Sequence, residues 1–210
     1  MFRVLIFAII GATAATEIGV FEDGPCPPVN MKSDFNFNAF SGKWYEIAKF
    51  PNAGEEGSRG LCTTAEYLVN ELRGKVKNTH VVDGIKTYIE GDLTLIAPAK
   101  IMLTYTFGGQ AKNSYLYILD TDYYNYSIGY SCKYFKNTGK RQIFSWILSR
   151  TNTIDGYAKS CVDKFLAENS HIINPSYYVY NDHSDQACEA RSFRKITQFL
   201  SSCPLPWLNY

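Results

Sequence analysis

The sequence has little net charge, few histidines and no long apolar segment after its first residues. It holds 21 basic and 20 acidic side chains, so it offers no basic field for nucleic acid or anionic lipid. Its three histidines, at 80, 171 and 183, lack the spacing with acids or cysteines that zinc sites use, and no Gly-x-Ser-x-Gly elbow is present. We expect neither a metal site nor catalysis. These absences favour a binding protein.

The first residues resemble a secretory leader. Arg3 is followed by an apolar run over 4–12 and small residues over 12–15, as in a signal peptide cut after Ala15 or Ala14, of which we favour Ala15. The apolar run is far shorter than the roughly 20 residues that span a bilayer. We therefore predict a signal peptide at 1–15 and a secreted, extracellular protein without a membrane span.

Strand-like segments follow one another at near-regular spacing, and 15% of the residues are aromatic. Tight-turn residues separate several of them, such as 82–84 and 137–139. The predicted strands are 42–50, 61–69, 74–82, 85–96, 100–107, 114–121, 126–134 and 142–150. Eight strands in up-and-down order predict a closed antiparallel β-barrel.

The pattern changes to helical after Arg150. Apolar residues recur at three- and four-residue steps from Ala158 to Leu166, which predicts a helix on the outer wall, capped by Thr153 or Asp155. A last strand is expected at 177–180 and a second short helix at 192–201. No repeat or low-complexity tract divides the chain, so we predict one domain at 16–190 and a C-terminal extension at 191–210.

Alternation along the strands predicts which side chains face inward. In 126–134, the face with Tyr126 and Tyr130 should lie under the helix, leaving the small and polar face to the lumen. In the first strand, Trp44 should close the bottom while Glu46 and Ala48 point into the cavity. The glycine-rich loop over 51–60 should gate the mouth. Such a mixed lumen suits a large, flat, partly polar ligand.

Six cysteines in a secreted chain predict disulfides, although six allow fifteen connectivities. Cys26 lies on a proline-rich arm that Cys132, on an outward strand face, can hold. Cys62 and Cys188 would tie the tail to the second strand. For Cys161 and Cys203 two alternatives stay open: a third bond, or a buried thiol with a free or intermolecular Cys203.

Three short regions resemble the signatures of the lipocalin family. They are Gly42-Lys43-Trp44, Thr121-Asp122-Tyr123 and Ser149-Arg150. The surrounding residues, including Asp23-Gly24-x-Cys26-Pro27 and Gly129-Tyr130-x-Cys132, are similar to those of the insect bilin-binding proteins and insecticyanins, and more distantly to apolipoprotein D. The resemblance implies an eight-stranded lipocalin barrel with a C-terminal helix packed outside it.

The resemblance also implies structural roles for several residues. Trp44 should stack on Arg150 beside Gly42 at the closed end, as a cation–π contact. The family pattern implies the pairs Cys26–Cys132 and Cys62–Cys188. The tail departs from the family, because such chains end soon after the equivalent of Cys188.

By resemblance, the chain binds a biliverdin-type bilin non-covalently, as a pigment carrier. The residues implied to line its pocket are Asn78, His80, Ile89, Tyr105, Phe107, Ser114, Leu116, Ser131, Lys133, Gln142, Phe144 and Trp146. Rings would grip the conjugated tetrapyrrole, Asn78 and His80 would bond its polar groups, and Lys133 would meet a propionate. No metal is expected.

Other functions stay open at this point. The ligand could be a retinoid, carotenoid, hormone or fatty acid, and an isomerase of lipocalin type with a cysteine in the lumen is a further alternative. The tail, with Arg191, Arg194 and Lys195 before an apolar stripe, could bind a protein. Asn125 begins a glycosylation sequon, and homo-oligomers are not excluded.

Overall fold

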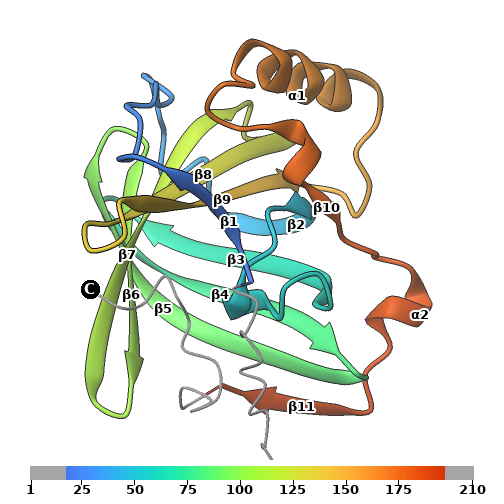
Figure 1. Ribbon diagram of the computed structural model, residues 1–210. Helices are drawn as coiled ribbons and strands as arrows, with labels where there is room; N and C mark the ends of the chain where they lie inside the picture. Colours follow the sequence, from blue (N-terminus) through green and yellow to red (C-terminus); the bar gives the residue numbers. More distant parts are fainter. Residues whose placement is uncertain (1–17, 197–210) are drawn as a thin grey trace, which may run out of the picture.

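The computed structural model describes residues 18–196, and its centre is a closed antiparallel barrel (Figure 1). Each strand pairs with the next along the chain, and β9 pairs back with β2. The eight strands are β2 (Gly42–Lys49), β3 (Leu61–Asn70), β4 (Arg73–Val82), β5 (Ile85–Ala97), β6 (Lys100–Phe107), β7 (Gln110–Thr121), β8 (Tyr126–Phe135) and β9 (Lys140–Ser149). The predicted barrel and its strand order are confirmed.

One end of the barrel is closed around Trp44, which is fully buried. The Arg150 guanidinium lies 3.7 Å from the centre of the Trp44 ring, as predicted. Arg150 also donates hydrogen bonds to the backbone carbonyls of Ser41, Lys43 and Tyr123, each at 2.9 Å. The cation is thus held by ring and carbonyls together, and it ties the start of β2 to the end of β9.

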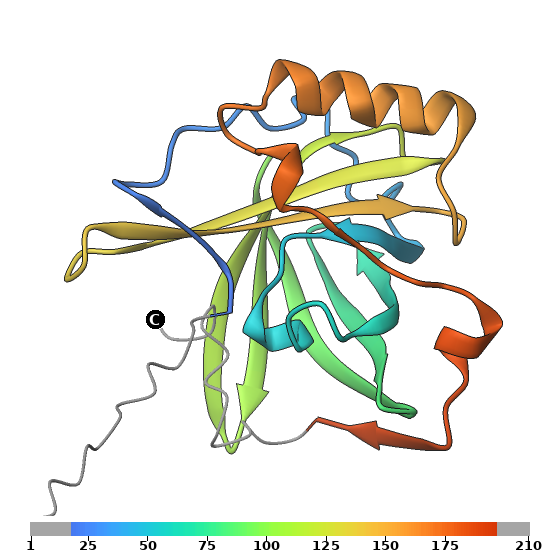
Figure 2. The same cartoon turned by 45° about the vertical axis from the view of Figure 1, so that its right-hand side comes forward.

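The helix α1 (Gly156–Glu168) packs against the outside of the barrel, along β8 and β9 (Figure 2). Its buried residues, Val162 and Leu166, belong to one apolar cluster with Tyr126, Ile128 and Tyr130 of β8. The predicted outward face of β8 is therefore confirmed. The helix begins after Asp155, one of the two predicted caps, although the Asp155 side chain makes no capping hydrogen bond.

Shorter elements extend the barrel at both ends of the chain. Before the proline-rich arm that carries Cys26, β1 (Val20–Asp23) pairs with β9. After α1 come η2 (Pro175–Tyr177), β10 (Val179–Tyr180), α2 (Asp185–Cys188) and β11 (Ser192–Lys195), while η1 (Ala53–Glu55) lies in the glycine-rich loop. No helix of residues 18–196 is long and apolar enough to span a bilayer.

The second helix predicted at 192–201 is wrong where the structure describes it. Residues Ser192–Lys195 form β11, which pairs in parallel with Ile85–Tyr88 of β5. The unpaired backbone edge of β5 supplies hydrogen-bond partners, and such tertiary pairing outweighs a weak local helix preference. The rest of the predicted segment lies outside the described residues.

Two disulfides fasten the chain ends to the barrel wall. Cys26 bonds to Cys132 and Cys62 to Cys188, as predicted, across separations of 106 and 126 residues. Cys161, on α1 and on the outside of the barrel, forms no disulfide with any cysteine of residues 18–196. Cys203 lies outside the described residues, so its predicted alternatives stay predictions.

Candidate functional site

The barrel encloses a cavity of about 360 Å³, within the size range of small-molecule sites. Its wall comes from β2 through β9, with the loop after β2 and the segment from Arg194 of β11 to Ile196 also contributing. The loop contributes Ala53, Gly54, Glu55 and Glu56, so the segment predicted to gate the mouth does line the cavity. Most of the lining is apolar, with a few polar groups among the rings.

The structure brings most of the predicted pocket residues together. Those that line the cavity are Asn78, His80, Ile89, Tyr105, Ser114, Leu116, Ser131, Phe144 and Trp146. Phe107, Lys133 and Gln142 are buried but lie outside the cavity lining. The Lys133 ammonium instead lies 5.0 Å from the centre of the Phe135 ring. Which of these side chains touch a ligand stays a prediction.

A β-bulge in β2 changes the side chains that this strand presents to the cavity. Its pairing with β9 shifts register between Glu46 and Ala48, so the alternation of faces is interrupted there. Ala48 joins the apolar cluster outside the barrel instead of the lumen, and that expectation is wrong. Lys49 falls on the same side as Glu46.

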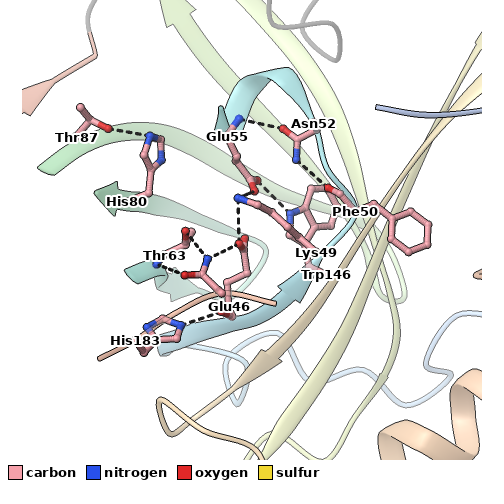
Figure 3. A network of polar contacts seen from close by, with 11 residues as sticks. Glu46, Lys49, Phe50, Asn52, Glu55, Thr63, His80, Thr87, Trp146 and His183 are labelled. Atoms are coloured by element: carbon pink, nitrogen blue, oxygen red, sulfur yellow. Dashed lines mark hydrogen bonds and ion pairs between the residues drawn. The ribbon is translucent and has the colours of Figure 1, made fainter. Parts of the chain in front are cut away.

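Glu46, Lys49 and Glu55 form a buried charged cluster in the cavity wall (Figure 3). The Lys49 Nζ lies 3.2 Å from Glu46 Oε1 and 2.7 Å from Glu55 Oε2. Asn181 donates to Glu46 Oε1 at 2.9 Å, and the Trp146 indole donates to Glu55 Oε1 at 3.1 Å. With all three groups ionised, the cluster holds one net negative charge against the cavity.

The protonation of this cluster follows from burial and mutual attraction. Burial, together with the nearby Glu55 carboxylate, raises the pKa of Glu46 to about 7. Burial also opposes ionisation of the other two groups. However, the two carboxylates keep the pKa of Lys49 above its ordinary value, and the ion pair with Lys49 keeps the pKa of Glu55 below its own. Glu46 is therefore the group of the cluster that titrates near neutral pH.

Two further pairs of polar side chains lie in the wall. His80 Nε2 lies 2.9 Å from Thr87 Oγ1, and burial lowers the pKa of His80, so its ring is neutral at pH 7. The Asn78 amide donates to the Tyr105 hydroxyl at 2.8 Å. Beside them, the rings of Phe144 and Trp146 lie within 9° of parallel, with centroids 6.1 Å apart. The wall therefore combines a flat aromatic surface with fixed hydrogen-bonding groups.

Reasoning from the sequence missed two members of the charged cluster. The bulge decides on which face of β2 the Lys49 side chain lies, and the sequence of β2 offers no signal for that bulge. Glu55 is placed by η1, which Asn52 caps by accepting a hydrogen bond from the Glu55 backbone N–H at 3.1 Å. An Asn three residues before an acidic residue is a recognisable start of a helical turn, so the turn that places Glu55 could have been predicted from the sequence.

The five cysteines within residues 18–196 do not supply a reactive group to the cavity. Cys62, His183 and Cys188 have ligand atoms within 4.8 Å of one another, but both sulfurs are in the disulfide and are not thiolate ligands. The thiol of Cys161 lies on α1, on the far side of the barrel wall. An isomerase that depends on a cysteine in the lumen has no such residue within 18–196.

Comparisons with known proteins agree with this geometry. Residues 41–185 match the lipocalin / cytosolic fatty-acid binding protein family. Insecticyanin-B of Manduca sexta is 37% identical over 203 residues, which cover 94% of this chain and 98% of that protein. Bilin-binding protein of Pieris brassicae is 36% identical over 187 residues, covering 88% and 97%. Apolipoprotein D of Macaca fascicularis is less similar, at 31% over 176 residues, covering 81% and 89%.

The solved structure of insecticyanin from the tobacco hornworm Manduca sexta superposes with a TM-score of 0.80 at 38% identity, covering 85% of this chain and 97% of that one. The barrel, its Trp44–Arg150 closure and these matches lead to one conclusion. The chain belongs to the lipocalin family and is related to its bilin-binding members.

Proposed function

We propose that this protein is a secreted carrier that holds a biliverdin-type bilin non-covalently in the barrel, and that it is not an enzyme. The observation that supports this most is the cavity wall itself, where the parallel rings of Phe144 and Trp146 lie beside buried carboxylates. A bilin has a flat conjugated face for the rings and pyrrole N–H donors for carboxylate acceptors such as Glu46 and Glu55.

Two further observations support the proposal. The relatives named above include a protein called bilin-binding protein, at 36% identity. The two disulfides fit an oxidising extracellular compartment, in agreement with the predicted leader at 1–15. A tetrapyrrole of about 40 non-hydrogen atoms, at roughly −0.3 kcal/mol per atom, corresponds to nanomolar-class affinity.

The test is a titration of the purified protein with biliverdin, followed by absorption in the near-ultraviolet and red bands. Ser114→Phe should weaken binding at least tenfold, because it fills a cavity position on β7. Ala111→Phe is the matched control, since Ala111 is an exposed residue of the same strand.

Protein purified from its source supplies an independent answer. A blue or green protein with paired bands agrees with the proposal. A colourless protein loaded with fatty acid, retinoid or hormone, or equal biliverdin affinity in the two variants, contradicts it.

A further inference from the structure

The strand β11 closes a gap in the barrel wall. β5 pairs with β4 from Ile85 onward, whereas its pairing with β6 begins only at Asp92. The second edge of residues 85–88 is therefore open to another strand. β11 occupies it in parallel, running along β5 in both views (Figures 1 and 2), and the N–H of Ile196 donates to the Tyr88 carbonyl at 2.8 Å.

Several contacts hold β11 in this position. The Cys62–Cys188 disulfide fixes the chain shortly before the strand. The ring of Phe193 stacks on Tyr88 at 4.8 Å between centroids, and Lys195 forms an ion pair with Glu90. The Lys77 ammonium lies 4.4 Å from the centre of the Tyr88 ring. Residues 192–196 are thus built into the wall and are more than a solvated charged run.

The inner face of β11 belongs to the cavity. Arg194 is paired in register with Thr87, and Thr87, Arg194, Lys195 and Ile196 all contribute to the cavity lining. Ile196 also packs on the apolar cluster of the barrel interior. Within residues 18–196, Arg194 makes no ion pair, whereas Lys195 and Lys49 are both paired with glutamates. Arg194 therefore presents an uncompensated positive charge at the rim.

We propose that β11 is part of the ligand site and that Arg194 binds a carboxylate of the ligand at the cavity mouth. This inference rests on the proposed function, because a bilin has two propionates. The direction follows from charge. Inside the cavity, Lys49 is already paired with Glu46 and Glu55, so the charged cluster offers the carboxylate of a ligand no free positive charge. A guanidinium at the rim binds a carboxylate with two parallel hydrogen bonds. The acidic end of the ligand should therefore lie at β11.

The test compares Arg194→Gln with Arg191→Gln in the full-length protein. Both variants remove one positive charge from the same segment, but Arg191 is not part of the cavity lining and lies beside Gly84. Each is titrated with biliverdin and with biliverdin dimethyl ester, which lacks the carboxylates. A second pair of probes is cis-parinaric acid and its methyl ester. Thermal melting checks that both variants fold.

We expect Arg194→Gln to weaken binding of each acid about threefold to fivefold relative to Arg191→Gln, and to leave the esters unchanged. Arg194→Lys should retain part of the preference, and high salt should reduce it. If the native protein rejects biliverdin but Arg194→Gln abolishes its preference for parinaric acid over the ester, the bilin proposal fails and the role of Arg194 stands. If acid and ester respond alike, or no acid is preferred, the role of Arg194 is overturned whatever the pigment result.

Discussion

The buried carboxyl of Glu46 should make the stability of this protein depend on pH in a defined window. Its side chain is 5% exposed, and burial beside Glu55 raises its pKa from the ordinary 4.5 to about 7. Between these values the folded protein holds a proton that the unfolded chain has released. The contribution of Glu46 is therefore fully present below pH 4.5 and is lost as the pH rises to about 7.

The size of the effect follows from the same two values. Going from 4.5 to about 7 at about 1.36 kcal/mol per pH unit gives a loss of about 3 kcal/mol in the free energy of unfolding. Other groups act in different directions. Burial lowers the pKa of His80 and of His183, so their contribution to stability increases as the pH rises. The pH profile of the native protein alone therefore mixes opposite slopes.

The variant Glu46→Gln separates them, because Gln keeps an acceptor for Asn181 but does not titrate. Urea unfolding at pH 4.5, 5.5, 6.5 and 7.5 gives the free energy of unfolding for both proteins. The free energy of unfolding of the variant minus that of the native protein should rise by about 3 kcal/mol between the lowest and the highest pH. Glu66→Gln, at an exposed position of β3, should show no such gain. A flat or reversed difference for Glu46→Gln would refute the reasoning.

Two further predictions concern the groups that hold the barrel closed. Arg150→Ala should lower the free energy of unfolding by about 3 kcal/mol, since it removes the Trp44 contact and several bonds to carbonyls, whereas Arg73→Ala at an exposed position should change it little. Equal urea midpoints for the two would contradict the closure role. Replacing Cys26 and Cys132 with Ala should cost about 4 kcal/mol, and Cys161→Ala less than about 1 kcal/mol; a large loss for Cys161 alone would show that its thiol matters to folding.

The sequence predicted the barrel well because its signals are local and repeated. Strands of alternating polarity and tight turns are readable within a few residues, and the resemblance to the lipocalin signatures implied the Trp44–Arg150 contact; all are confirmed. Of the charged cluster, the sequence predicted only that Glu46 faces the cavity. A single bulge reverses the parity of β2 after Glu46, so Lys49 replaces Ala48 on the inner side, and no residue type marks that bulge. The strand β11 was missed because its partner, the open edge of β5, exists only once the barrel has formed.

The bulge in β2 separates a part of the strand that closes the barrel from a part that lines its cavity. Up to Glu46 the strand follows regular alternation, which places Trp44 under the Arg150 guanidinium at the closed end. Past the bulge the same strand turns a lysine toward two carboxylates in the cavity wall. Buried ion clusters are weak contributors to stability, because desolvation offsets most of their attraction. The closed end, the apolar clusters and the disulfides therefore contribute more to stability than this charged cluster does. Regular pairing without the bulge would turn Lys49 into the apolar cluster under α1 and remove Phe50 from that cluster, so the bulge is also what keeps the outer face of β2 apolar.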